Sequence, residues 1–579
     1  MSSISDVRHT LAHLLAQAVL EHYPSAVLTL GPAVDNGFYY DIDFKDVSLS
    51  DTELGKIQKS MRKNIKKWTE FTHEVVSRDE ALARFAGNVY KTELINEIAD
   101  RGETITLYTC GGFTDLCRGG HAENPAAEID TDSFKLDRVA GAYWRGDEKN
   151  PMLTRIYGLA FASPAELDAY IVQREEAIKR DHRKVGVEQD LFTFSDLVGS
   201  GMPLYTPRGN IVRNAIINYS RELNARLGFG EVHTPNVNKA ELFKISGHYD
   251  AYKEDMMSVR SQYVEDEMFL KPMNCPQHTQ IYSSRPRSYR DLPIRYADFA
   301  NLYRDERPGQ LSGLTRLRSF AQDDGHIFCR EDQVEAELLN VLDVVKDALS
   351  TYGVGYWIRL SLRDPNNKEK YLGSDEAWEQ SQSQLLSILE KSGVEFKPAE
   401  GEAAFYGPKL DIMAVDALGR EWQISTIQVD RTMPTRFGLE YMGDDGTKKT
   451  PVMIHRALIG SPDRFMGILI EHYAGAFPLW MAPVQVRVLP VSEKHTDYAA
   501  AAVDTLLQNG IRAELDHSDS LGKRIRNVKV QKIPYYIVVG DEEVNATTVT
   551  VENRAGAKNT ESIESFIERL KRDISSRSL

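Results

Sequence analysis

The sequence predicts a multidomain α+β protein with a largely antiparallel sheet at its centre. The chain has 579 residues, which is enough for three or four domains at roughly 100–200 residues each. Between about residues 183 and 480, long helical patterns alternate with strand-like segments. They lack the regular strand, helix, strand cadence of a doubly wound sheet, so a mixed, mostly antiparallel sheet is expected there.

Composition excludes several classes of protein. Asp plus Glu number 85 against 70 Lys plus Arg, a net charge of −15, and hydrophobic residues make up 42%, as in ordinary soluble domains. The apolar stretch at 473–486 is too short for a membrane span and contains two prolines. Four cysteines cannot form a disulfide framework. The first residues carry no targeting pattern, so a cytoplasmic protein without membrane contact is expected.

The first region, residues 1–164, mixes one long helix with short strands and Gly-rich turns. A charged helix over 165–182 follows, starting with Ser163 before Pro164, the pattern of a cap and a first helical proline. It has few apolar residues and therefore suits a linker between domains better than a core.

The third and fourth regions span 183–480 and 481–579. In the last one, VQVRVLPV and YYIVVG are typical strands, and HTDYAAAAVDTLLQNG is a helix closed by Gly510. These elements predict a small α/β domain at the C-terminus.

The segment 302–329, LYRDERPGQLSGLTRLRSFAQDDGHIFC, carries the strongest chemical signal. If 317–327 is one extended strand, alternate side chains share a face, which resembles the floor of a binding site. Arg304 and Glu306 are expected on one face of a preceding strand. The alternative is a solvated, charged hairpin. The shared face of 317–327 comprises Arg318, Phe320, Gln322, Asp324 and His326.

This segment resembles the second signature motif of class II aminoacyl-tRNA synthetases, and in detail that of threonyl-tRNA synthetases. GFGEVHTP at 228–235 resembles the dimer-interface motif, and HRALIGSPDRF at 455–465 resembles the third motif with Arg464. The resemblance implies an antiparallel class II catalytic core, an N-terminal α+β editing domain and a C-terminal α/β anticodon-binding domain. It also implies a homodimer that joins L-threonine to tRNA(Thr) using ATP.

Activation by ATP is an in-line attack on a phosphorus atom, so catalysis rests on positioning and on neutralising phosphate charge. Arg304 suits the α-phosphate and Arg464 the far end of the nucleotide, because guanidinium groups match phosphate oxygens. Phe320 offers a flat face to adenine, and the resemblance implies Mg bound with ATP. It further assigns to the ATP and substrate site Glu306, Arg316, Gln322, Tyr406, Lys409, Gln423, Gln428 and Ser461.

The resemblance also implies a zinc ion, one per subunit, held by Cys275, His326 and His455. Their separations of 51 and 129 residues match no local metal motif. One thiolate and two imidazoles leave a position open for the amino and hydroxyl groups of threonine, with Asp324 orienting the hydroxyl. Cys329 has a ligand-like spacing from His326, but i and i+3 point to opposite faces of a strand, so it is expected to be a buried thiol.

A zinc site cannot exclude serine, because a missing methyl group is worth only about 1–3 kcal/mol. A second, hydrolytic site is therefore expected. HTLAH places His9 and His13 on one helix face, away from the apolar stripe. CRGGH supplies Cys117 and His121, a spacing typical of a metal site.

The quartet resembles the editing site of threonyl-tRNA synthetases, which is not thought to require a metal, so a metal there stays open. The family often carries a small ubiquitin-like domain before the editing domain, and we expect a form without it because HTLAH begins at residue 9. The resemblance adds Tyr40, Lys91 and Asp115 to this site.

A basic stretch, LGKRIRNVKVQKIP, predicts a tRNA phosphate contact in the C-terminal domain, although a solvated helix face is the alternative. Glu543 matches a base-contacting position of the family, whereas Ser518 and Glu552 depart from its Asn and Arg. A synthetase-like RNA-binding protein without catalysis is the alternative to the ligase. The five cations are Lys523, Arg524, Arg526, Lys529 and Lys532.

Overall fold

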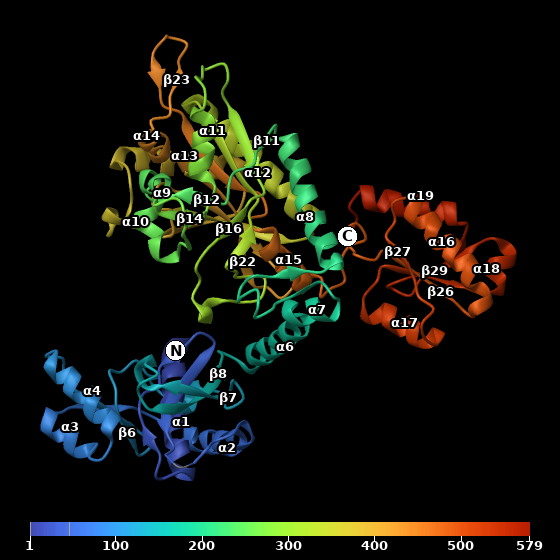
Figure 1. The fold of residues 1–579 in the computed structure, drawn as a ribbon. Coiled ribbons are helices and arrows are strands. Elements are labelled where there is room, and N and C mark those ends of the chain that lie inside the picture. Colours follow the sequence, from blue (N-terminus) through green and yellow to red (C-terminus); the bar gives the residue numbers. More distant parts are fainter. Residues whose placement is uncertain (1, 46) are drawn as a thin grey trace. The chain divides into compact units, whose positions relative to one another are not determined.

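The computed structural model describes residues 2–45 and 47–579 and divides into two compact units (Figure 1). They comprise Met1–Glu175 and Glu176–Leu579. Among the described residues, no helix is long and apolar enough to cross a membrane.

The division between the units falls inside α6 (Pro164–Arg180), the charged helix expected at this place. Ser163 caps it by accepting a hydrogen bond from the Glu166 N–H at 3.3 Å, and a single residue of the helix, Leu167, is buried. A helix with so little buried surface derives little stability from packing, which agrees with a connecting role.

The N-terminal unit is built on α1, which Ser3 and Asp6 start with a capping box. Its larger sheet has the order β1-β3-β8-β7 with β2 added to β3, and its smaller sheet has the order β4-β5-β6. The apolar face of α1 packs with α2 and the larger sheet into one core. The elements are α1 (Ile4–His22), β1 (Val27–Leu28), β2 (Ala33–Val34), β3 (Gly37–Asp43), α2 (Leu54–Asn64), β4 (Thr72–Val75), α3 (Arg78–Arg84), α4 (Val89–Asp100), β5 (Thr106–Cys110), β6 (Phe113–Leu116), α5 (Pro125–Glu128), β7 (Phe134–Tyr143) and β8 (Met152–Ala160).

The second unit contains an eight-stranded sheet with the order β11-β15-β18-β25-β22-β21-β19-β20. The two outermost pairs are parallel and the other five are antiparallel, which confirms the predicted mixed, largely antiparallel sheet. Helices α8, α12, α13 and α15 contribute to its core. The sheet strands are β11 (Gly230–Glu231), β15 (Ile294–Asp298), β18 (Asp324–Cys329), β19 (Gly355–Leu362), β20 (Phe396–Glu400), β21 (Lys409–Val415), β22 (Glu421–Asp430) and β25 (Val452–Ala457).

The rest of this part of the second unit consists of helices and short strands. The helices are α7 (His182–Glu188), α8 (Pro207–Arg226), α9 (Ala240–Ser246), α10 (His248–Tyr252), α11 (Cys275–Ser283), α12 (Val334–Thr351), α13 (Asp375–Ser392), α14 (Thr432–Arg436) and α15 (Pro462–His472). The short strands are β9 (Phe192–Thr193), β10 (Leu204–Tyr205), β12 (Val237–Lys239), β13 (Ser258–Val259), β14 (Met268–Leu270), β16 (Asn301–Tyr303), β17 (Ser319–Ala321), β23 (Tyr441–Met442) and β24 (Lys448–Lys449).

The segment 317–327 is not one strand, so that prediction is wrong. β17 pairs with β16, whereas β18 pairs with β15 and β25. The chain leaves the first ladder at Asp323, whose N–H donates to the Gly460 carbonyl at 2.8 Å and whose carboxylate binds Arg456 at 3.0 Å. Arg304 and Glu306 follow β16 and do not lie in a strand.

The C-terminal part of the second unit is the predicted small α/β domain. Its sheet has the order β27-β26-β28-β29-β30, with β26 parallel to both neighbours. Gly510 ends the first helix with φ 77°, a conformation that suits glycine. The elements are β26 (Val486–Pro490), α16 (Thr496–Gln508), β27 (Ala513–Leu515), α17 (Leu521–Val530), β28 (Tyr535–Val539), α18 (Asp541–Ala546), β29 (Val549–Asn553), β30 (Lys558–Glu561) and α19 (Ile563–Ser575).

Candidate active site and metal clusters

A pocket of about 1390 Å³ opens on the middle of the eight-stranded sheet. It is lined by every residue that the sequence analysis assigned to ATP, threonine and the central metal. Arg318, which was expected on the same strand face, does not line the pocket; its guanidinium donates to the Glu306 carbonyl at 2.7 Å. The sequence-predicted residues in its lining are Cys275, Arg304, Glu306, Arg316, Phe320, Gln322, Asp324, His326, Tyr406, Lys409, Gln423, Gln428, His455, Ser461 and Arg464.

Sheet register explains why these distant residues meet. His455 on β25 is directly opposite His326 on β18 and Gln428 on β22. Ser461 caps α15 by accepting the Arg464 N–H at 3.3 Å, which places Arg464 in the first turn of that helix. Pairing of neighbouring strands therefore builds the site, and a short capped turn adds its second arginine.

Two arginines in the pocket are well placed for an anion. The Arg304 guanidinium lies 5.2 Å from the Phe320 ring, and desolvation by the surrounding protein lowers its pKa. The pKa of Arg464 is lowered by burial and by the nearby charge of Arg316. Among the described residues, the buried Nε of Arg464 has no hydrogen-bond partner. A phosphate would supply the acceptors and the charge that these groups lack.

Cys275, His326 and His455 form a compact buried cluster. Their ligand atoms all lie within 4.8 Å of one another. Burial raises the pKa of the Cys275 thiol well above its ordinary value, and burial lowers the pKa of His326 well below its own. The Cys275 thiol and the His326 ring are therefore uncharged by themselves, and the donor set of the cluster fits a tetrahedral metal with one open position.

Three residues around this cluster were missed by the sequence analysis. Asp430 lies 3.0 Å from His455 Nε2, His278 Nδ1 lies 2.7 Å from His326 Nδ1, and His248 Nε2 lies 3.8 Å from Cys275 Sγ. Asp430 could have been predicted, because it lies two residues after Gln428 on one strand and therefore on the same strand face. His278 could also have been predicted, because it follows Cys275 by three residues on the same helix, α11. His248 lies 27 residues before Cys275 and had no such signal.

A second cluster lies in the N-terminal unit and contains His9, His13, Cys117 and His121, again within 4.8 Å of one another. Cys117 Sγ lies 3.2 Å from His121 Nε2 and 3.5 Å from His9 Nε2. The two glycines of CRGGH have φ of 91° and 83°, values that glycine adopts without strain. The predicted tight turn is therefore present, and it folds His121 back onto Cys117.

The three further residues predicted for this site form one buried chain of contacts. Lys91 Nζ lies 2.5 Å from the Asp115 carboxylate, the Tyr40 hydroxyl donates to the same carboxylate at 2.6 Å, and His13 Nδ1 lies 3.1 Å from it. His13 is only 5% exposed. The sequence analysis did not predict this burial, which arises because the ring is directed at Asp115.

These contacts change the protonation of Cys117 and His13 in the N-terminal cluster. Burial opposes ionisation of Cys117, but hydrogen bonds from His121, His13 and His9 outweigh it and lower the thiol pKa to about 3. Burial likewise opposes charge on His13, but hydrogen bonds to Asp115 and Cys117 raise its pKa to about 9. At neutral pH the cluster therefore holds a thiolate and an imidazolium side by side.

Three family models match the chain in the order that the sequence motifs suggested. The Threonyl and Alanyl tRNA synthetase second additional domain matches residues 105–157, the tRNA synthetase class II core domain (G, H, P, S and T) residues 256–473, and the anticodon binding domain residues 485–573. The threonine–tRNA ligase of Rubrobacter xylanophilus is 47% identical over 576 residues, covering 99% of this chain and 89% of that protein. The chain belongs to the threonine–tRNA ligase family.

Other comparisons agree with membership of the threonine–tRNA ligase family. The threonine–tRNA ligase of Thermus thermophilus is 48% identical over 590 residues, covering 99% of this chain and 89% of that protein. A solved structure described as the RNA binding domain of threonyl-tRNA synthetase from Cryptosporidium parvum has a TM-score of 0.65 and 37% identity, covering 68% of this chain and 98% of that one. Membership confirms the predicted class II fold and enzyme class, and it supports the ligase over the non-catalytic alternative.

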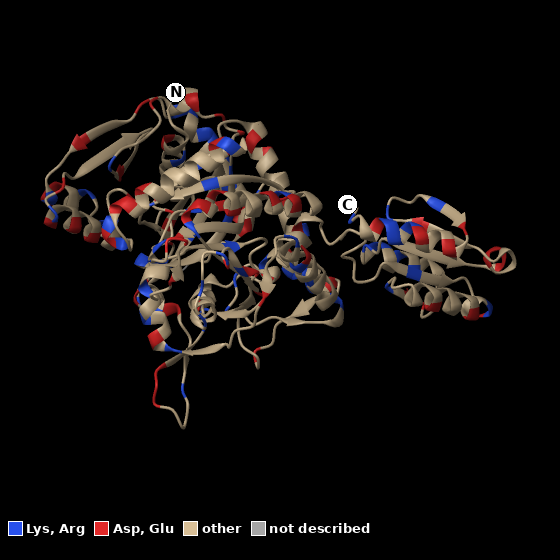
Figure 2. Ribbon diagram, turned by 90° about the horizontal axis from the view of Figure 1, so that it is seen from above, with Lys and Arg blue, Asp and Glu red and all other residues tan. Residues whose placement is uncertain are grey.

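The basic stretch differs from its prediction, although it lies within residues 485–573, which match the anticodon binding domain model. Arg524 is buried and donates to the Asp516 carbonyl at 2.7 Å, and Lys532 follows α17 and donates to the Ala474 carbonyl. Both cations are therefore directed into the protein. Figure 2 shows Lys and Arg interspersed with Asp and Glu over this domain. The exposed cations of the stretch are Lys523, Arg526 and Lys529.

The carboxylates predicted near the anticodon are also engaged within the protein. Glu543 accepts the Gly540 N–H at 2.8 Å and the Thr550 hydroxyl at 2.6 Å, so it caps α18. Glu552 is 9% exposed and lies between Lys529 at 3.7 Å and Lys558 at 3.4 Å. Its charge is compensated locally, which explains how an acid is accommodated where relatives are expected to carry arginine.

Proposed function

We propose that the chain is an active threonine–tRNA ligase that forms threonyl-adenylate from L-threonine and ATP and transfers threonine to tRNA(Thr). The observation that carries this proposal is the single pocket that brings the predicted nucleotide residues and the Cys275, His326, His455 cluster together. The class II core model supports it independently, because it matches the same stretch of chain.

Within this proposal the residues of the pocket position ATP and neutralise its charge. Phe320 supports the adenine ring, Arg304 binds the α-phosphate where the threonine carboxylate attacks, and Arg464 binds the far end of the nucleotide. Arg316 and Glu306, which both line the pocket, form a 2.8 Å ion pair. Magnesium bound with ATP is part of the proposal, as the family implies.

We further propose that Cys275, His326 and His455 hold one zinc ion per subunit. When bound, zinc would supply an open coordination position for the amino and hydroxyl groups of threonine. Asp324 orients the hydroxyl. Valine has the same shape but no hydroxyl and would leave the pocket unsatisfied, so strong rejection is expected.

The N-terminal cluster is proposed to hydrolyse Ser-tRNA(Thr). Asp115 and the Cys117 thiolate hold His13 in its charged form, and Lys91 compensates the charge of Asp115. A charged imidazole and an adjacent thiolate can orient a water molecule and move its proton at the ester. The additional-domain model over residues 105–157 supports this placement.

The remaining parts of the proposal concern assembly and location. We propose an editing domain over 1–164, a linker helix over 165–182, a catalytic domain over 183–480 and an anticodon-binding domain over 481–579. The exposed cations of α17 contact tRNA phosphates, and Glu543 remains a proposed base contact. A homodimer and a cytoplasmic location complete the proposal, in keeping with the family.

The deciding experiment is threonine-dependent exchange of pyrophosphate into ATP by the purified chain. We expect exchange with threonine, weak exchange with serine and none above background with valine. A folded protein that contains zinc but supports no exchange with threonine would contradict the proposal.

A further inference from the structure

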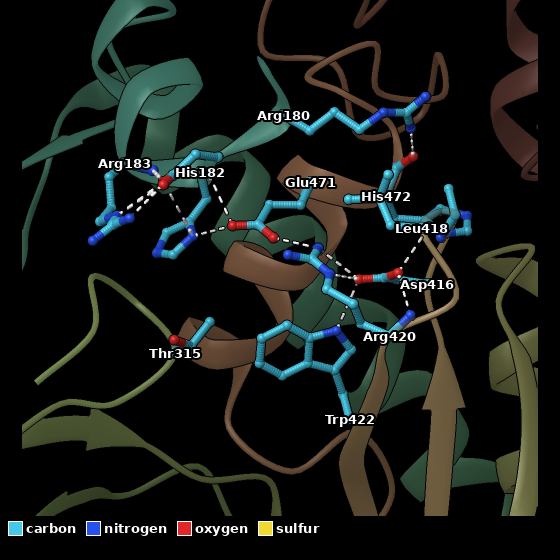
Figure 3. Close-up of polar contacts among 12 residues, drawn as sticks. Arg180, His182, Arg183, Thr315, Asp416, Leu418, Arg420, Trp422, Glu471 and His472 are labelled. Atoms are coloured by element: carbon cyan, nitrogen blue, oxygen red, sulfur yellow. Dashed lines mark hydrogen bonds and ion pairs between the residues drawn. The ribbon is translucent and has the colours of Figure 1, made fainter. Parts of the chain in front are cut away.

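His182 lies outside the residues assigned to the reaction, yet it contacts Leu314 in the lining of the nucleotide pocket and Glu471 on α15, the helix that carries Arg464. It is the first residue of α7 and is 3% exposed. Its Nδ1 lies 2.6 Å from Glu471 Oε1 on α15, and the Leu314 N–H donates to its Nε2 at 2.9 Å. Figure 3 shows the imidazole directed at the Glu471 carboxylate.

These two contacts fix the protonation state of the ring. A nitrogen that accepts an N–H carries no proton, so the proton of the neutral ring lies on Nδ1 and is donated to Glu471. Asp181, His182 and Glu471 are residue types that bind metals and lie close together. Because both ring nitrogens of His182 are already engaged, this group holds a loop and not an ion.

The loop that His182 contacts is packed tightly against the ring. Leu314 is fully buried. A Cβ placed on Gly313 would lie 2.1 Å from His182 Nε2, and Gly313 has φ 50°. A glycine is therefore required here by close approach as well as by backbone conformation. The following residues, Leu314 to Leu317, line the pocket together with Phe320 and Arg464.

The second partner of His182 connects through further contacts to Arg464, another residue of the pocket lining. Glu471 also accepts a hydrogen bond from Arg420, and Arg420 Nε donates to Asp416 at 2.7 Å. Trp422 Nε1 donates to Asp416 at 2.9 Å, as Figure 3 shows. The ring of Trp422 lies 5.9 Å from the Arg464 guanidinium. One continuous network thus extends from the loop to a proposed phosphate-binding arginine.

We propose that His182 is a positioning residue for ATP: its neutral imidazole clamps the 313–317 loop to α15 and thereby sets the wall of the nucleotide pocket. The inference rests on the proposed assignment of that pocket to ATP. His182 lies two residues after the end of α6. The residue that shapes the nucleotide site is therefore among the first residues of the catalytic domain.

The test uses two substitutions of His182, each of which keeps one of the two hydrogen bonds of the imidazole ring. In His182→Asn the side-chain amide can still donate to Glu471 but does not reach the Leu314 N–H. In His182→Gln the longer amide offers an oxygen to Leu314. The backbone N–H of residue 182, which donates to Glu471 at 3.1 Å, is present in both variants.

In pyrophosphate exchange, His182→Asn should raise the KM for ATP about 3- to 10-fold, the range expected for one lost hydrogen bond. Its KM for threonine and its kcat should stay within about 2-fold, because neither the threonine site nor the reacting groups are touched. His182→Gln should return the KM for ATP to within about 2-fold of the parent.

A second variant tests the loop itself. Gly313→Ala places a methyl group against His182 Nε2 and should raise the KM for ATP by a similar factor. The double variant Gly313→Ala, His182→Asn should raise the KM for ATP little more than either change alone, because both changes remove the same contact between His182 and the loop. As a control, His495→Asn changes another buried histidine, which lies 3.2 Å from Asp541, and should leave the KM for ATP unchanged.

Two results would overturn the inference: a parental KM for ATP in His182→Asn, or equal rises in the Asn and Gln variants, which would indicate a merely structural role. Loss of folding is checked by the melting temperature and zinc content of each variant. Failure of the proposed function is recognised separately, because then the parent itself would show no threonine-dependent exchange.

Discussion

The two clusters of cysteine and histidine use the same ligand types but have opposite protonation. In the N-terminal cluster the pKa of Cys117 is lowered to about 3 and that of His13 is raised to about 9. In the central cluster burial raises the pKa of Cys275 and lowers that of His326. At neutral pH the first cluster holds an ion pair, whereas Cys275 and His326 of the second are uncharged until a cation binds.

The difference arises from what surrounds each thiol. Lys91 and Asp115 form a buried pair beside His13, and three imidazoles lie near Cys117. Near Cys275, by contrast, the charged neighbours are Asp324 and Asp430, which oppose a thiolate further. The central cluster therefore needs a metal to become ionised, and the N-terminal cluster can hold a thiolate without one.

The largest expected effect is on the central cluster. His455→Ala should remove zinc and lower threonine activation by more than about 1000-fold, because the metal and the group that it holds are lost together. Elemental analysis and pyrophosphate exchange measure the two losses. Cys329→Ala, which changes a fully buried thiol on the same sheet, is the control and should keep about one zinc per chain. Normal zinc and activation in His455→Ala would refute the zinc site.

Next in size is the effect on hydrolysis. Cys117→Ala or His13→Ala should slow the clearance of preformed Ser-tRNA(Thr) by about 100-fold, the contribution of a positioned acid or base, with threonine activation unchanged. His22→Ala, an exposed histidine on the same helix, serves as the control. Clearance at the parental rate in both variants would show that hydrolysis occurs elsewhere.

A smaller effect is expected at the carboxylate beside the central cluster. Asp430→Asn removes the charge that orients His455 at 3.0 Å and should weaken zinc binding by about 10-fold or more. Competition with a chelator of known affinity measures the change. Asp416→Asn, a buried carboxylate in another network of the same domain, should leave zinc affinity unchanged; an equal loss there would mean that Asp430 has no specific role.

The smallest expected effect is that of metal removal on hydrolysis. A zinc chelator should abolish threonine activation but alter the clearance of Ser-tRNA(Thr) by less than about 2-fold, because the charge of Cys117 is already balanced by His13. Both rates are measured on one treated sample. Parallel loss of the two activities, restored by added zinc, would show that the N-terminal cluster binds a metal as well.

Local patterns were sufficient for several elements. Strand alternation and Gly510 predicted the C-terminal domain, Ser163 predicted the start of α6, and the i, i+4 spacing placed His9 and His13 on one helix. The family motifs predicted the lining of the central pocket. These features depend on neighbouring residues or on a recognisable sequence, so they can be read without coordinates.

Other features were decided by tertiary structure. The break at Asp323 depends on Gly460 and Arg456, partners more than 130 residues away in the chain. The burial of His13 depends on Asp115, and the inward direction of Arg524 depends on a carbonyl of another turn. The partners of Asp323 and His13 are far away in the chain, and the partner of Arg524 is a backbone carbonyl, so none of them leaves a periodic side-chain signal.

The sequence by itself therefore determined the fold class, the family and the chemical groups of both sites. The tertiary structure decided their charge states and their supporting contacts, such as Asp430 beside His455 and His182 between Glu471 and Leu314. The physical reason is that protonation and positioning depend on burial and on groups brought together by strand register and helix packing, whereas residue identity and local periodicity are already present in the unfolded chain.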